Sequence, residues 1–139
     1  MARSYAGYLS DAARAYLALA RADSATALKS LAALPDTMCM VNDCFFEKLT
    51  EARLNAARGH DREAERILDQ WLQTRDRSPL FVLGTLERGR IAERLRDPEL
   101  AVESYQFVVN IWHHADPELQ PFVAEARAGI ARLRGEGER

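Results

Sequence analysis

The fold is decided by residues 89–105, which read GRIAERLRDPELAVESY. Asp97 stands directly before Pro98. An aspartate side chain can accept a hydrogen bond from a free backbone N–H of a first helical turn, and proline fixes the φ angle that this turn needs. The pair therefore predicts a helix start, with Ala101 and Tyr105 one turn apart behind it and a glycine in the helix before it. Small residues on both helices indicate a closely packed helical hairpin.

Further marks of the same kind divide the rest of the chain. They are Ser78-Pro79, Asp116-Pro117, Gly59 before Asp61, and a break at Pro35-Asp36. Abundant alanine and apolar stripes at helical spacing favour helix between these marks, and no segment alternates apolar and polar residues as a half-buried strand does. The sequence therefore predicts an all-α protein with seven helices, at residues 4–21, 24–34, 41–58, 61–74, 79–95, 98–114 and 117–134.

Positions 37 residues apart carry residues of the same kind, which indicates an internal repeat. Two columns hold small residues and three hold large ones. They are Ala15, Ala52 and Gly89; Ala27, Ala64 and Ala101; Tyr8, Phe45 and Val82; Leu31, Leu68 and Tyr105; and Leu34, Trp71 and Val108. Paired helices approach closely only where side chains are small, so these columns predict the inner faces of three stacked hairpins.

The spacing resembles the tetratricopeptide repeat, a helix pair with a nominal period of 34 residues. Gly89, Ala101 and Tyr105 match that pattern best, while the longer period and the loss of the usual first-helix aromatic depart from it. The resemblance implies one domain over residues 1–139, in which three repeats form a right-handed superhelical stack closed by a capping helix. The repeats span about 4–34, 41–74 and 79–114, and the cap spans 117–134.

Two stretches, Leu54 to Leu68 and Asp116 to Pro121, also resemble the C-terminal tetratricopeptide regions of bacterial serine/threonine kinases and signalling regulators. The sequence has no glycine-rich phosphate loop and no HRD or DFG motif. This resemblance implies a scaffold part without the enzyme, either as a module in bacterial signalling or as a detached C-terminal part of a larger regulator.

Charge and composition exclude several classes of protein. The 139 residues include 21 acids and 19 bases, giving a net charge of −2, whereas duplex-binding proteins carry a basic excess. No apolar run reaches the ~20 residues of a membrane span, and no signal peptide is evident. We therefore expect a soluble cytoplasmic protein that contacts neither nucleic acid nor membrane. An RNA-binding helical repeat is a weaker alternative, because it needs a basic groove.

Metal binding and catalysis are both disfavoured. Cys39 and Cys44 with His113 and His114 could form a zinc site, but the cysteines are wider apart than in zinc fingers and adjacent histidines on a helix face apart. A disulfide between the two cysteines stays open. His60 has no nucleophile or acid near it in the sequence, so we expect no enzyme, no cofactor and no metal.

The resemblance places the first helix of each repeat along a concave groove. The predicted groove residues are Leu9, Ala12 and Tyr16; Phe46, Leu49 and Arg53; and Leu83, Leu86 and Arg90. We expect this ladder to bind a protein or peptide partner through apolar anchors, with two arginines at its edge for a carboxylate. An alternative is that the leucines belong to the core and the arginines pair with Glu51, Glu87 or Glu93.

The N-terminal helix is too apolar for one buried stripe. Tyr5, Tyr8 and Leu17 are therefore predicted to mediate self-association, as in a homodimer, or docking of an upstream domain.

Overall fold

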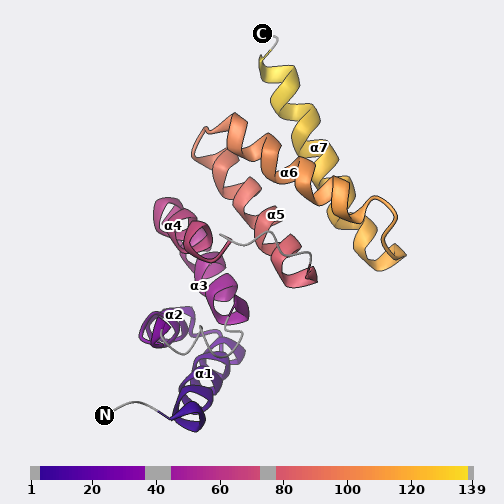
Figure 1. Cartoon of the computed structure of the whole chain (residues 1–139). Helices are drawn as coiled ribbons and strands as arrows, with labels where there is room; N and C mark the ends of the chain where they lie inside the picture. The colour runs from indigo at the N-terminus through magenta and orange to yellow at the C-terminus, as the bar shows by residue number, and fades with distance from the viewer. Residues whose placement is uncertain (1–3, 37–44, 73–77, 138–139) are drawn as a thin grey trace.

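The computed structural model describes residues 4–36, 45–72 and 78–137. Within these ranges the chain forms seven α-helices and no strand, which confirms the predicted all-α class (Figure 1). The helices are α1 (Tyr5–Ala20), α2 (Ser24–Ala32), α3 (Phe45–Ala57), α4 (Asp61–Trp71), α5 (Pro79–Arg94), α6 (Pro98–Trp112) and α7 (Gln120–Gly137), with a 3₁₀ turn η2 (Pro117–Leu119) before α7. The predicted helical residues 41–44 and 73–74 lie outside the described residues.

The predicted helix starts can be compared with the observed ones. Asp97 caps α6 as expected, because its Oδ1 accepts a hydrogen bond from the Leu100 N–H at 3.0 Å. Asp61 is the first residue of α4, as expected, and its carboxylate accepts hydrogen bonds from Arg94 of α5 at 2.8 and 2.9 Å. Asp116 makes no side-chain cap bond, and the 3₁₀ turn η2 replaces the first turn of the predicted helix 117–134.

The three hairpins close with the same backbone turn. Ala22, Gly59 and Arg96 are 37 residues apart and have φ angles of 60°, 79° and 59°. In each turn, the next residue donates its N–H at 2.9 Å to the carbonyl five residues back, a bond that satisfies one of the free carbonyls at a helix end. The period therefore exists in the backbone as well as in the side chains. The repeat does not depend on glycine, because only one of the three turns has it.

The predicted columns form the core. Each hairpin has its own buried cluster, and the third cluster also includes residues of α7. Ala27, Ala64 and Ala101 are each 0% exposed, so they allow α2, α4 and α6 to lie close to their neighbours. Trp71 packs against the first and second clusters and joins the hairpins.

The hairpins follow one another from the N-terminal end to α7 in an elongated stack (Figure 1). Helix α7 packs on α6, and the ring of Tyr105 lies at the contact between them. A Cβ on Gly89 of α5 would lie 2.7 Å from this ring, and one on Gly129 of α7 would lie closer still. Tyr105 therefore fits between two glycines on different helices, which fixes how closely α5, α6 and α7 approach.

Candidate functional site

The residues predicted for the groove separate into exposed and buried groups. Leu9 of α1 and Phe46 of α3 are 47% and 52% exposed, although both side chains are large and apolar. The half-buried ring of Tyr16 lies 5.5 Å from that of Phe46, and its hydroxyl is 3.5 Å from Thr50 Oγ1. We call Leu9, Tyr16 and Phe46 the apolar patch. It lies on the first helices of the first two hairpins.

Three predicted groove residues cannot contact a partner from the surface. Ala12 is 4% exposed, Leu49 is 1% and Leu86 is 0%, so all three belong to the core. The reason is that α3 and α5 each pack on several neighbours, and the apolar residue one turn before the arginine faces the interior. This finding corrects the predicted lining and favours the alternative that assigned these leucines to the core. Leu83 is half-buried and packs against two clusters.

The two predicted arginines have carboxylate partners within the chain. Arg90 Nε and Nη2 donate to Glu125 of α7 at 2.6 and 2.7 Å, and Arg90 Nη1 donates to Glu87 at 2.8 Å. Arg53 Nε lies 3.6 Å from the same Glu87 carboxylate, which is only 8% exposed. Tyr16 of α1 therefore contacts α3. Arg53 links α3 to α5 in the same way, and Arg90 links α5 to α7.

The contacts between Arg90 and Glu125 shift the pKa values of both groups. Hydrogen bonds to Glu125 raise the pKa of Arg90, although its burial works in the other direction. The bonds from Arg90 lower the pKa of Glu125 below its ordinary value. Three N–H groups of Arg90 are already engaged within the chain, so an incoming carboxylate would compete with two internal ones. Sequence reasoning named Glu87 only as an alternative partner and missed Glu125, because the residues of this pair lie 35 positions apart.

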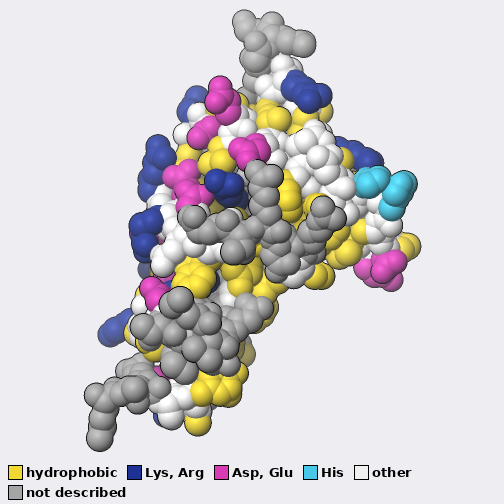
Figure 2. All heavy atoms as spheres, viewed as in Figure 1, with side chains coloured by type: hydrophobic (Ala, Val, Ile, Leu, Met, Phe, Trp, Pro, Cys, Tyr) yellow, Lys and Arg dark blue, Asp and Glu magenta, His cyan; other side chains and the backbone are white. Residues whose placement is uncertain are grey.

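Hydrophobic side chains reach the surface around the N-terminal hairpin, whereas acidic and basic side chains alternate along one edge nearer the C-terminal end (Figure 2). Of the residues predicted for self-association, Tyr5 is 47% exposed and Leu17 is 50% exposed. Tyr8 is 3% exposed and is a core residue of the first hairpin, so its predicted place at the surface is wrong. Its ring stacks on that of Tyr5, with centroids 6.4 Å apart.

Cys39 and Cys44, predicted as candidates for a zinc site or a disulfide, lie outside the described residues. His113 and His114 follow Trp112, the last residue of α6, with ring centroids 4.0 Å apart, and Nδ1 of His113 is 2.9 Å from the Asn110 carbonyl oxygen. Their rings meet, although adjacent helix positions were expected to point them apart. Among the described residues, no group of three or more His, Cys, Asp or Glu side chains is placed to hold a metal ion.

None of the helices in the described ranges combines the length and apolar character that crossing a membrane requires.

No protein-family model matches the sequence, and no curated protein matches it. Among solved structures, the chain is similar to PcrH from Pseudomonas aeruginosa, with a TM-score of 0.73. The match covers 96% of this chain and 96% of that one, at 16% sequence identity. The likeness confirms the tetratricopeptide-like helical-repeat fold, and at this identity it concerns the fold alone.

Proposed function

We propose that this chain is a protein-binding module, and that its apolar patch holds an apolar segment of a protein partner. The exposure of Leu9 and Phe46 carries this proposal, together with the contact between the Tyr16 and Phe46 rings, because exposed apolar surface of this kind marks contact sites in soluble proteins. The fold supports it, since stacked helical hairpins present extended faces to partners. The half-buried Tyr16 adds a hydroxyl that a bound peptide can meet.

The chemistry of the partner follows from what the face offers. Near the N-terminal end it offers aromatic and aliphatic surface, and farther along it offers arginines already paired with Glu87 and Glu125. We infer that the partner inserts aromatic or aliphatic side chains at the apolar patch, as an amphipathic helix or an extended strand would. A terminal carboxylate of the partner would have to compete at Arg90 with Glu87 and Glu125, so we assign recognition to the apolar contacts.

The cellular role is a finer part of the proposal. The resemblance to kinase-associated repeats supports a scaffold in bacterial signalling or regulation, working in the cytoplasm. Self-association through α1 is the alternative, and the exposure of Tyr5 and Leu17 favours it. An RNA-binding repeat receives less support, because the chain has a net charge of −2 and the arginines of this face are paired with carboxylates.

The experiment is selection of peptides from a random phage library on the immobilised chain. Selected peptides should share aromatic or aliphatic residues and should fail to bind a Leu9→Glu/Phe46→Glu variant, in which two carboxylates replace the apolar patch. An Ala25→Glu/Ala124→Glu variant adds the same charge at exposed positions of α2 and α7 and should bind them unchanged. Peptides that bind all three proteins equally would contradict the proposal.

A further inference from the structure

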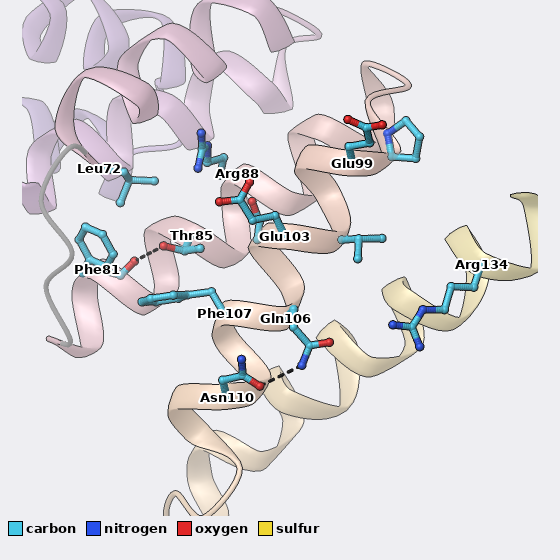
Figure 3. Close-up of a pocket in the computed structure, with 13 residues that line it drawn as sticks. Leu72, Phe81, Thr85, Arg88, Glu99, Glu103, Gln106, Phe107, Asn110 and Arg134 are labelled. Atoms are coloured by element: carbon cyan, nitrogen blue, oxygen red, sulfur yellow. Dashed lines mark hydrogen bonds between the residues drawn. The ribbon is translucent and has the colours of Figure 1, made fainter.

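A cavity of about 920 Å³ lies between the end of α4, the helices α5 and α6, and the C-terminal part of α7. Its apolar part is formed by Leu72, Phe81 and Phe107, and the two phenylalanine rings meet edge to face at 5.8 Å (Figure 3). Val102 of α6 also lines it. The volume falls in the range of about 300–1,000 Å³ that is typical of ligand sites.

This cavity is separate from the apolar patch. Helix α5 contributes Phe81, Thr85 and Arg88 to the cavity, and each lies two positions before Leu83, Glu87 or Arg90 respectively. Two positions on an α-helix correspond to a rotation of about 200°. The cavity therefore opens on the opposite side of α5 from Glu87 and Arg90, and none of its lining residues belongs to α1 or α3, which carry the apolar patch.

One polar group in the cavity wall is unsatisfied. Ser104 of α6 is 1% exposed, and its hydroxyl has no hydrogen-bond partner among the described residues. A buried hydroxyl without a partner destabilises a folded protein, so a ligand atom that meets it is favoured. The neighbouring Thr85 hydroxyl donates to the Phe81 carbonyl at 3.0 Å, which leaves the Thr85 oxygen able to accept a bond.

The rim of the cavity is acidic on α6. Glu99 and Glu103 are exposed, stand one helical turn apart, and have no ion-pair partner in the described part of the chain. Like charges at this spacing repel each other, and a cation between them removes the repulsion. Arg88 does not provide that cation, because its Nε lies 3.0 Å from Asp69 Oδ1. Arg134 belongs to α7 and stands at the other end of the cavity from Leu72 (Figure 3).

We propose that this cavity is a second binding site, which takes a short apolar-basic segment of a protein partner. An aromatic side chain of the segment lies against Phe81 and Phe107, and a neighbouring Lys or Arg pairs with Glu99 and Glu103. The backbone of the segment reaches the Ser104 hydroxyl. Binding here is independent of the apolar patch, so the module can hold two segments at once, one against α1 and α3 and the other against α5 and α6.

The test uses two capped dipeptides, N-acetyl-Phe-Arg-amide and N-acetyl-Phe-Glu-amide, titrated into the ¹⁵N-labelled full chain. The first probe should shift the backbone amide signals of Thr85, Val102 and Phe107 and leave those of Leu9 and Phe46 in place. The second should bind about two- to five-fold more weakly, as expected for the loss of an exposed ion pair. Equal affinity of the two probes, shifts confined to the apolar patch, or no shifts at all would overturn the proposal.

Two variants locate the binding. Val102→Trp fills the cavity from a half-buried position and should abolish the shifts. Glu99→Gln/Glu103→Gln changes only exposed side chains, so it keeps the fold even if the tryptophan variant does not, and it should remove the preference for the arginine probe. Asp116→Asn/Glu118→Gln removes the same charge at exposed positions beyond the C-terminal end of α6, before and within η2, and should keep that preference. A preference that survives in the Glu99/Glu103 variant contradicts the proposed ion pair.

Discussion

Arg90 and Glu125 join α5 to α7 through two parallel hydrogen bonds of 2.6 and 2.7 Å, and a third bond from Arg90 reaches Glu87. The guanidinium side chain is 30% exposed, and the Glu87 side chain is 8% exposed. Bidentate pairing of this kind is stronger and more directional than a single contact. Arg90, which sequence analysis assigned to partner binding, therefore attaches the C-terminal helix to the third hairpin.

Arg90→Ala should lower the free energy of unfolding by about 1–3 kcal/mol, because it leaves the largely buried Glu87 carboxylate without its closest partner. Arg66→Ala is the matched control. Arg66 pairs with Glu63 at 2.6 Å, but their side chains are 61% and 46% exposed, so its loss should change stability by less than about 0.5 kcal/mol. Urea unfolding measures both. Equal effects would show that Arg90 contributes no more than a surface residue.

Stability should fall in acid because of Glu125 and Glu93. Hydrogen bonds from Arg90 lower the pKa of Glu125; burial of Glu93 opposes a lower pKa, but hydrogen bonds from Arg132 and Tyr105 outweigh that burial. A glutamate whose pKa is lower in the folded protein stabilises the fold at pH values above its ordinary pKa of 4.5. This contribution is lost as the pH falls through the pKa of the folded state. The melting temperature should therefore drop as the pH falls below about 4.5.

The Glu93→Gln/Glu125→Gln variant isolates this effect. It should be less stable than the parent at pH 7 and should lose less stability between pH 7 and pH 3. Thermal melts at both pH values measure the difference. An identical loss in parent and variant would assign the acid sensitivity to other carboxylates.

Gly129→Ala should destabilise the protein by about 1–3 kcal/mol, because its Cβ would enter the ring of Tyr105, which is itself held against Gly89. Gly135→Ala lies on the same helix, and its Cβ would meet nothing within 4 Å. That control should be neutral or stabilise the protein by up to about 1 kcal/mol, as expected for alanine replacing glycine in a helix. Chemical denaturation distinguishes them, and similar values for both would mean that Tyr105 does not seat α7 tightly.

The shared conformation of the hairpin turns predicts that substitutions at Arg96 and Gly59 change stability in opposite directions. Arg96 is exposed with a φ angle of 59°, which is strained for a residue with a Cβ, so Arg96→Gly should stabilise the chain by about 1 kcal/mol. Gly59 has the equivalent conformation, with φ of 79° and open space where a Cβ would go. Gly59→Ala should therefore cost about 1 kcal/mol through backbone strain alone. Two changes of the same sign in urea unfolding would contradict the shared turn.

Local chemistry made much of the fold predictable from the sequence. The aspartate and serine before proline, and the columns of Ala27, Ala64 and Ala101, depend on interactions within one hairpin, and such interactions leave a signal in short stretches of sequence. The turns at Ala22 and Arg96 left no such signal, because neither residue is glycine. They adopt positive φ angles since the hairpin around them requires the same turn as at Gly59.

The candidate site was less predictable, because it depends on which side of each helix is covered. Leu49 and Leu86 occupy the same repeat position and are in the core, whereas Leu9 and Phe46, which share the position three residues earlier, are exposed. The difference arises from neighbouring helices, which periodicity within one helix does not identify. The pairing of Arg90 with Glu125 likewise needs the position of α7.

Self-association through α1 stays a prediction, now with a smaller set of residues. Tyr5 and Leu17 are about half exposed, whereas Tyr8 is buried and belongs to the first hairpin. At high micromolar concentration, light scattering should give the mass of a homodimer. Tyr5→Glu/Leu17→Glu should return it to a monomer with an unchanged helical circular dichroism signal, because both side chains point into solvent in the single chain and a carboxylate there opposes only an apolar interface.

The charge-matched Ala25→Glu/Ala124→Glu variant separates loss of the interface from general repulsion, and it should remain a dimer. Substituting Tyr8 cannot serve this purpose, since a charge at a position 3% exposed would unfold the hairpin and remove any dimer indirectly. A monomeric mass for the parent chain at the same concentration rules out self-association through α1. In that case the exposed side chains of α1 are available only to a different protein.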